Sequence, residues 1–388
     1  MLRKNTGDGG IVASMARLLP LKAFAYGYSN ARVRSMRPHL LARRQAEDLL
    51  KVNTNAAVIE YLSRTSYRND FEGMPSRMKD EERVELAVGK NFARTAQKLR
   101  RVTPKQSSGT LETFLNRYDI HNIKTILLAK KLGRSREETQ ALLVPAGSMA
   151  QKEIAAMLSA KNADDFYAAM RGTEFGAKFF TSASARNIPK EQIKALFQNP
   201  SSDGAKLDVF LSSLDFFYYE MASTMNAEGD SDAKKISDLL RYEADTKNIM
   251  TILRLKRGNA DKATIMKNVA RGGRLSRATL EKIAAAKDMA EALSLSTAFF
   301  MSKTGKDEFA AAEQLYKADG QLSHFEVVFE RSMARRSLKA LRTSIMSIGA
   351  IVGFLFLKEG EMANIQKIVR GKALGLPAEK VSQMLIFV

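Results

Sequence analysis

Acidic, amide and basic side chains recur at fixed spacing in three stretches of this 388-residue sequence. Each stretch follows the pattern (Asp/Glu)-x-x-Asn-Ile-x-x-Ile-(Leu/Val)-x-x-Lys, and the three asparagines lie 126 and 116 residues apart. In chain order, the acid, asparagine and lysine of these motifs are Asp119, Asn122 and Lys130; Asp245, Asn248 and Lys256; and Glu361, Asn364 and Lys372. Such groups can form ion pairs or hydrogen bonds, and the spacing along the chain indicates which of these is possible.

The motif is typical of one face of a helix. At 100° per residue, the acid and the lysine fall on the same apolar stripe as the isoleucines, and 11 residues separate them by about 16 Å along the axis. They cannot pair with each other, so each needs a partner on another element or must reach water. We expect the charges to fix the docking of helices within or between repeats. The alternative for the charges is that they are exposed at the edge of the stripe. The asparagine also lies at the edge of the stripe, where it could bond the backbone of a neighbouring loop. A ligand-binding role for the asparagine is less favoured.

The repetition of the motif predicts the organisation of the chain. We expect an N-terminal extension at residues 1–20 and three similar helical repeats at 21–147, 148–273 and 274–388. No stretch shows sustained apolar and polar alternation, so the expected fold class is all-α with little or no sheet. The apolar run at 345–357 is too short for a membrane span of roughly 20 residues and is expected to be a buried helix. The N-terminal residues lack a clear cleavage site and are expected to form a tail.

Each repeat is expected to contain the same parts in the same order. Two short helices come first, at 39–51 and 54–64, 150–159 and 163–171, and 276–286 and 288–299. A long helix follows, at 82–100, 207–225 and 325–342. The motif helix comes next, for example at 111–132 with Thr110 as its N-cap, and a glycine follows near the same offset in each repeat: Gly133, Gly258 and Gly375. A short closing helix ends the repeat, with Ser135 and Glu138 forming a capping box in the first.

The residues offer no case for catalysis or for a bound cofactor. There is no phosphate-binding loop, no cysteine, and the three histidines lie far apart in the sequence, so neither nucleotide nor metal binding is expected. The net charge of +20 instead predicts an acidic partner. Candidate residues for a basic contact surface are Arg32, Arg34, Arg335 and Arg336. A basic helical-repeat protein that binds nucleic acid is the alternative interpretation, although there is no tryptophan and no interleaving of aromatic and basic residues.

Together, three features resemble a known family: residues 26–34, the three motif helices, and the final stretch at 364–377. They are similar to the C subunit of the archaeal and bacterial A/V-type ATPases, whose eukaryotic relative is the d subunit of the vacuolar ATPase. The resemblance implies a pseudo-threefold, funnel-shaped, all-helical protein without an active site, nucleotide or cofactor. One copy per complex would sit peripherally on the cytoplasmic face of the membrane rotor ring and receive the central shaft. It would couple shaft rotation to proton or sodium transport.

Overall fold

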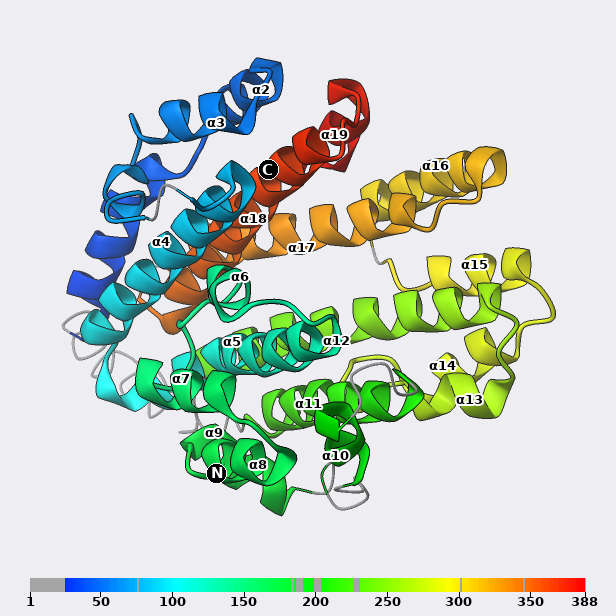
Figure 1. Ribbon diagram of the computed structural model, residues 1–388. Coiled ribbons are helices and arrows are strands. Elements are labelled where there is room, and N and C mark those ends of the chain that lie inside the picture. Colours follow the sequence, from blue (N-terminus) through cyan, green and yellow to red (C-terminus); the bar gives the residue numbers. More distant parts are fainter. Residues whose placement is uncertain are drawn as a thin grey trace, which may run out of the picture.

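The chain is almost entirely helical in the computed structural model (Figure 1). The model describes residues 25–74, 77–182, 185, 191–198, 204–225, 231–300, 302–344 and 346–387. The expected N-terminal extension at 1–20 lies outside these residues. Within the described ranges there is no strand, which confirms the all-α prediction.

The helices follow the predicted order of parts. Residues 21–147 contain a helix at 25–36, η1 (Arg37–His39), α2 (Arg43–Lys51), α3 (Asn55–Leu62), η2 (Arg68–Asp70), α4 (Asp80–Val102), α5 (Lys105–Lys131) and α6 (Arg136–Ala141). Residues 148–273 contain α7 (Gln151–Ser159), α8 (Ala163–Arg171), α9 (Glu174–Thr181), α10 (Glu191–Gln198), α11 (Gly204–Thr224), α12 (Ser231–Arg257) and α13 (Lys262–Lys267). Residues 274–388 contain α14 (Arg277–Ala285), α15 (Met289–Thr297), α16 (Lys303–Asp319), α17 (Ser323–Thr343), α18 (Ile348–Ala373) and α19 (Ala378–Met384). The helix at 25–36, η1, η2, α9, α10 and α16 were not among the predicted elements.

Local capping explains why several helices begin where the sequence suggested. The second short helix of each set starts after a side chain that accepts a backbone N–H three residues on: Thr54, Asn162 and Asp288. The capping box of α6 is present, because Ser135 Oγ accepts from Glu138 N at 3.1 Å and Glu138 Oε2 accepts from Ser135 N at 2.9 Å.

One local prediction was wrong. Helix α5 begins at Lys105, directly after Pro104, so Thr110 lies inside it and caps nothing. A proline fixes φ in a range that suits a helix start, and this signal outweighed the threonine. The left-handed residue after each motif helix is not a glycine in every case. In the second repeat the left-handed conformation falls on Asn259, with φ of 58°, rather than on Gly258, whereas Gly133 and Gly375 adopt it at 63° and 65°.

Residues 348–357 of the apolar run form the first part of α18, which continues into the third motif without a break; residue 345 lies outside the described residues. The run is buried from Ser347 to Phe356, as predicted, whereas Met346 before the helix is exposed. The other motif helices, α5 and α12, are also long single helices and lie with α18 through the middle of the molecule (Figure 1).

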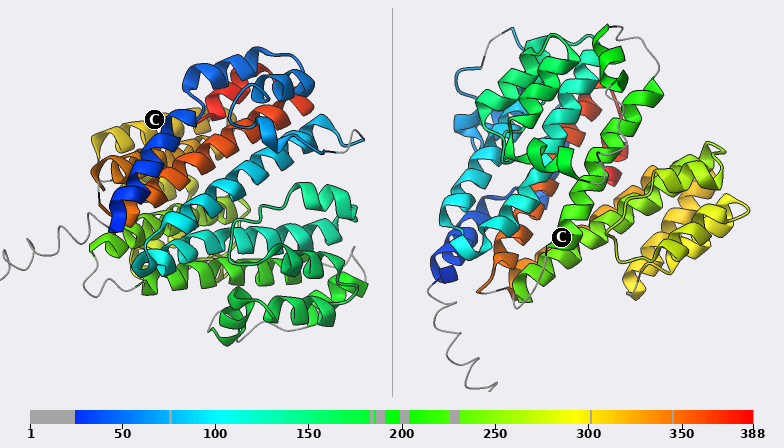
Figure 2. Two further views of the ribbon diagram at one scale, coloured as in Figure 1. Left: turned by 90° about the vertical axis from the view of Figure 1, so that its left-hand side faces the viewer. Right: turned by 90° about the horizontal axis from the view of Figure 1, so that it is seen from below.

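Three apolar cores surround the motif helices. One core packs α2 and α3 against α4, α18 and α19; a second packs α12 against α13 to α17; and the third surrounds α5 and extends over α7 to α12. The view from below makes the grouping visible, because α14, α15 and α16 project from the rest as an arm carried by α12 and α17 (Figure 2). Each core therefore combines a motif helix with a pair of short helices.

Candidate functional site

The motif asparagines make identical contacts in all three repeats. Each side chain forms a two-way hydrogen bond with the backbone of the residue 22 positions further along the chain, donating to its carbonyl and accepting from its N–H. The donor–acceptor distances lie between 2.8 and 3.0 Å for the pairs Asn122 and Val144, Asn248 and Ala270, and Asn364 and Ile386. An amide is the side chain that can satisfy both groups of one residue at once. The asparagine therefore fixes the loop that leaves its helix.

The acid of the first motif is fully buried and holds the loop that leads into α7. Asp119 accepts hydrogen bonds from Ser148 N at 2.7 Å, from Ser148 Oγ at 2.8 Å and from Met149 N at 3.0 Å. Burial raises the pKa of Asp119 to about 6 against the lowering effect of these donors. A Cβ added to Gly147 would stand 2.1 Å from Asp119 Oδ1, so the carboxylate needs a glycine there.

The acid of the second repeat repeats this arrangement. Asp245 is fully buried and accepts from Arg274 N at 2.9 Å and from Leu275 N at 3.1 Å. Burial likewise raises its pKa to about 6, opposed by the backbone donors. A Cβ on Gly273 would stand 2.0 Å from Asp245 Oδ1. Both aspartates thus bind the loop that leads into a short helix, α7 or α14.

The motif lysine binds the opposite end of the same short helix. Lys130 donates to Ala160 O at 2.9 Å, at the end of α7, and Lys256 donates to Ala284 O at 3.2 Å, at the end of α14. A nine-residue helix is about 13.5 Å long, which matches the roughly 16 Å between acid and lysine. The carboxylate lies at the positive end of the short helix and the ammonium at its negative end, which complements the helix dipole. Each motif helix therefore clamps one short helix at both ends.

In the third repeat the clamped helix comes from the other end of the chain. Glu361 accepts from Leu41 N at 2.8 Å, and Lys372 donates to Leu50 O at 2.9 Å and to Val52 O. These residues flank α2, which lies beside α19 at the top of Figure 1. The third motif helix, α18, thus holds α2. We call this set of contacts (Glu361 with Leu41, and Lys372 with Leu50 and Val52) the closure. It joins two distant parts of the chain without a covalent link.

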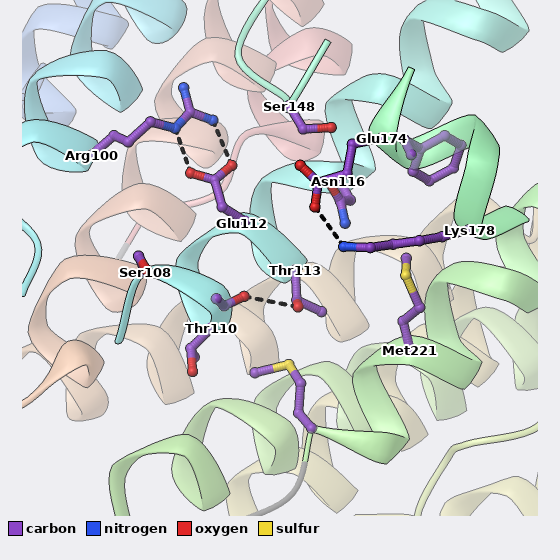
Figure 3. Close-up of a pocket in the computed structure, with 13 residues that line it drawn as sticks. Arg100, Ser108, Thr110, Glu112, Thr113, Asn116, Ser148, Glu174, Lys178 and Met221 are labelled. Carbon is purple, nitrogen blue, oxygen red and sulfur yellow. Dashed lines mark hydrogen bonds and ion pairs between the residues drawn. The ribbon is translucent and has the colours of Figure 1, made fainter. Parts of the chain in front are cut away.

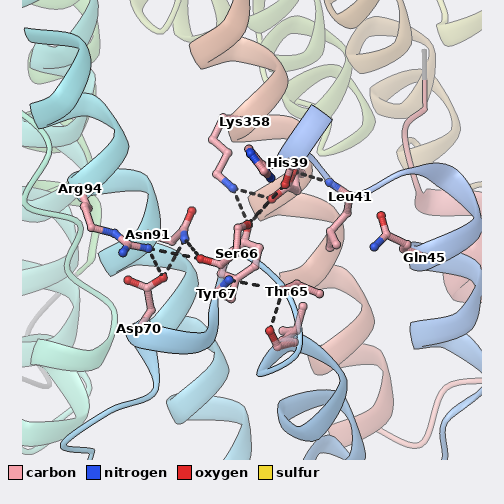
Figure 4. A network of polar contacts seen from close by, with 12 residues as sticks. His39, Leu41, Gln45, Thr65, Ser66, Tyr67, Asp70, Asn91, Arg94 and Lys358 are labelled. Atoms are coloured by element: carbon pink, nitrogen blue, oxygen red, sulfur yellow. Dashed lines mark hydrogen bonds and ion pairs between the residues drawn. The ribbon is translucent and has the colours of Figure 1, made fainter. Parts of the chain in front are cut away.

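A buried polar network reinforces this closure (Figure 4). Tyr67 donates to Glu361, and Lys358 Nζ lies 2.6 Å from Glu361 Oε1 and 3.0 Å from Tyr67 Oη. The Lys358 and Glu361 side chains are each 5% exposed. Burial raises the pKa of Tyr67 well above its ordinary value, and the neighbouring Glu361 adds to this effect. The phenol therefore remains a hydrogen-bond donor throughout the physiological range.

A second polar cluster joins the three motif helices themselves. Arg117 on α5 bonds Glu243 on α12 at 2.8 and 3.2 Å, and Glu359 on α18 at 3.3 Å. All three residues lie five positions before the asparagine of their motif. Equivalent positions of the three motif helices therefore meet at one point, which we call the hub (Arg117, Glu243 and Glu359).

The hub is held by aromatic contacts as well as charge. The Arg117 guanidinium lies 4.2 Å from the ring centre of Phe114 and 4.8 Å from that of Phe356, and Tyr118 donates to Glu359 at 2.5 Å. Burial alone would lower the pKa of Arg117, but the two glutamates hold it well above its ordinary value. The hub side chains are 15 to 19% exposed, so their charges are only weakly screened by solvent.

The largest of five cavities formed by the described residues, about 860 Å³, offers no catalytic arrangement (Figure 3). It lies between α5, α9 and α11, and its charged groups are paired with each other: Arg100 with Glu112 at 2.5 Å, and Lys178 with Glu174 at 2.6 Å. Within the described ranges, no three acidic or histidine side chains gather as a metal site would require. Nor does any helix among those residues have the length and apolarity needed to span a bilayer.

With this geometry established, comparison with known proteins decides the family. The model of the ATP synthase (C/AC39) subunit family matches residues 29–384. The chain belongs to the ATP synthase (C/AC39) subunit family. It is 26% identical over 365 residues to the C subunit of the A-type ATP synthase of Methanococcoides burtonii, covering 93% of this chain and 94% of the relative. It is 26% identical over 385 residues to that of Methanosphaera stadtmanae, with 97 and 92% covered, and 25% identical over 367 residues to that of Methanocaldococcus jannaschii, with 93 and 86% covered.

In this family member the four arginines suggested as a basic contact surface do not share one environment. Arg32 and Arg34 are exposed on the helix at 25–36. Arg335 instead pairs with Glu308 at 2.6 Å, and the Arg336 guanidinium lies 3.9 Å from the ring centre of Tyr242. The four residues therefore do not form a single free patch.

Sequence reasoning missed the hub and the closure. The hub residues differ in type, because one repeat supplies arginine and two supply glutamate, so they were not part of the repeated template. The signal that could have found them is charge at one register position, five residues before each motif asparagine. The closure has no comparable sequence signal, because no motif or spacing indicates that α2 packs against the third motif helix.

Proposed function

We propose that this chain is a non-catalytic central-stalk subunit of an A/V-type ATPase or ATP synthase. In that role it would couple the rotating shaft to the membrane rotor ring, for proton or sodium transport linked to ATP synthesis or hydrolysis. Membership of the ATP synthase (C/AC39) subunit family and the similarity to C subunits of A-type ATP synthases support this proposal.

The observation that carries the proposal is the meeting of three equivalent helix positions at the hub. Arg117, Glu243 and Glu359 come from α5, α12 and α18, and their contacts support a pseudo-threefold funnel built from repeats at 21–147, 148–273 and 274–388. A subunit that transmits torque must resist relative movement of its parts. Close packing and charge pairing between the repeats provide that resistance.

The clamps support the same conclusion. Each motif helix holds a short helix that belongs to another repeat in sequence, and the third clamp returns to the first repeat. A load applied to one repeat is therefore passed to its neighbours through hydrogen bonds at both ends of α2, α7 and α14. In our proposal the shaft subunits occupy the hollow and the ring lies beneath it. One copy sits peripherally at the cytoplasmic face, without nucleotide, cofactor or nucleic acid.

The proposal is tested first by identifying what the chain assembles with. A tagged copy is expressed in its native host, membranes are gently solubilised, and the captured proteins are identified by mass spectrometry. We expect catalytic, shaft and ring subunits of the ATPase. Recovery of nucleic acid or unrelated soluble proteins, with neither shaft nor ring, would reject the proposal.

A second measurement addresses coupling itself. Membranes that lack the chain are supplied with the wild-type protein or with Arg117→Ala, and ATP hydrolysis and ion transport are measured together. We expect the wild type to restore transport driven by ATP and the variant to give fewer ions moved per ATP hydrolysed. Arg134→Ala, at an exposed position after α5, is the matched control and should behave as the wild type. Equal transport with and without the chain would contradict a coupling role.

A further inference from the structure

A small cavity beside the closure has a lining that the proposed function does not use. Its volume is about 180 Å³, and it is enclosed by the helix at 25–36, η1, α4 and α18. The lining residues that bear or can acquire positive charge are Arg32, His39, Arg94, Lys98 and Lys358. It contains no carboxylate, whereas each of four other cavities formed by the described residues has at least one.

Two of these cations have no partner of opposite charge. Arg32 and Lys98 are exposed at the mouth and make no ion pair with any residue that the structure describes. In a protein of this size such side chains are common on the surface, but here they face one concave site together with further cations. Placing like charges around a cavity is unfavourable unless an anion compensates them.

Two further cations retain free donors. Arg94 donates through Nη2 to Asp70 at 2.7 Å and to Ser66 O at 3.4 Å, so its Nε and Nη1 groups have no partner among the described residues. The Lys358 side chain is 5% exposed. Its ammonium group donates two of its three N–H groups, to Tyr67 and Glu361, and keeps one free of partners in the described part of the chain. Figure 4 shows Arg94, Ser66 and Lys358 in one network, with His39 beside it. Buried and half-buried donors thus complete a site whose mouth is cationic.

The size of the cavity limits what can enter. A volume of 180 Å³ corresponds to about six water molecules. Pockets for larger small molecules start at roughly 300 Å³, so a nucleotide is too large to be enclosed. Tetrahedral oxyanions fit the chemistry, since guanidinium and ammonium groups bind phosphate oxygens and the Thr95 hydroxyl adds a further donor.

We propose that this cavity binds a single phosphate group, held by Arg32, Arg94, Lys98 and Lys358. The phosphate can belong to free orthophosphate or to the phosphomonoester headgroup of an anionic lipid. Because these four residues come from the helix at 25–36, from α4 and from α18, the bound anion links the first and third repeats beside the closure. The proposal does not depend on the coupling role.

The test uses the purified full chain and titrates potassium phosphate calorimetrically, with potassium chloride holding the ionic strength constant. We expect one saturable site, and a thermal unfolding midpoint that rises with phosphate because the ligand binds the folded state. Arg32→Gln and Lys98→Gln should each weaken binding about tenfold or more, as for loss of a charged hydrogen bond. Arg34→Gln is the matched control, because Arg34 is exposed on the same helix but does not line the cavity; its affinity should stay within about twofold.

A second arm separates the two sources of phosphate. The chain is sedimented with vesicles of phosphatidylcholine alone or of phosphatidylcholine with one-fifth phosphatidic acid. Binding to the acidic vesicles that is lost in Arg32→Gln and Lys98→Gln supports a lipid headgroup. Free phosphate is supported if Arg32→Gln and Lys98→Gln lose phosphate binding while vesicle binding is absent or is the same in all variants. The proposal is overturned if neither potassium phosphate nor the acidic vesicles bind the chain, or if Arg32→Gln and Lys98→Gln weaken neither kind of binding relative to the wild type.

Discussion

Replacing Arg117 by alanine tests whether the hub holds the three motif helices together. The change removes the guanidinium that bonds Glu243 at 2.8 and 3.2 Å and Glu359 at 3.3 Å. Two carboxylates would then face each other at 19 and 18% exposure without a cation between them. Breaking a buried pair in this way costs about 3–5 kcal/mol. The lost contacts with Phe114 and Phe356 add about 0.5–2 kcal/mol.

We therefore expect Arg117→Ala to lower the free energy of unfolding by roughly 3.5–7 kcal/mol. The assay is urea unfolding of the full chain, followed by far-ultraviolet circular dichroism. The matched control, Arg134→Ala, should change stability by less than about 0.5 kcal/mol because its side chain is exposed.

A triple variant distinguishes the loss of charge balance from the loss of packing. Arg117→Met combined with Glu243→Gln and Glu359→Gln removes the cation and both negative charges together, while the amide introduced at position 359 keeps an acceptor for Tyr118. Neutral replacement of a whole buried cluster is often tolerated, so we expect this variant to recover at least half of the lost stability. A single variant that loses less than about 1 kcal/mol, or a triple variant no more stable than the single one, would refute the reasoning.

Two further predictions concern the repeated elements. Asn259→Gly should raise the free energy of unfolding by up to about 1 kcal/mol in the same assay, because a left-handed residue without a Cβ is less strained. Adding a Cβ at the equivalent left-handed site, in Gly133→Ala, should lower the free energy of unfolding, and a stabilising Gly133→Ala would contradict this. Asp245→Ala should lower the free energy of unfolding more at pH 4 than at pH 7. The pKa of the Asp245 carboxyl is about 6 in the folded chain, against 3.8 for the ordinary value. The stability that this carboxyl contributes is therefore present below the ordinary value and is lost as the pH rises through about 6. The difference between the two pH values is about 2 kcal/mol, measurable as unfolding free energies of wild type and variant, and a cost independent of pH would show that Asp245 titrates alike in both states.

The short helices could be predicted from the sequence closely, because local signals define them. The ranges 150–159 and 163–171 correspond to α7 (Gln151–Ser159) and α8 (Ala163–Arg171), and Asn162 caps the second. The start of α5 was predicted less well, because Thr110 and Pro104 both offer a plausible boundary and sequence alone does not rank them.

The site could be predicted in part. The motif acids, asparagines and lysines follow from the repeated template, and helical geometry already required that acid and lysine find separate partners. The identity of those partners could not be predicted, since it depends on how helices from different repeats pack. The same holds for the hub, where Arg117 meets two glutamates that are far away in sequence, 126 and 242 residues from it.

The closure has a consequence for how the chain is made. The hydrogen bond between Leu41 and Glu361 joins residues 320 positions apart. At 5–20 residues per second, a ribosome needs roughly 15–60 s to synthesise the intervening chain. During that time the apolar side of α2 and α3, including Leu49, Val58 and Leu62, has no motif helix to cover it. The α2–α3 pair is therefore open to aggregation and chaperone binding until α18 and α19 have been synthesised.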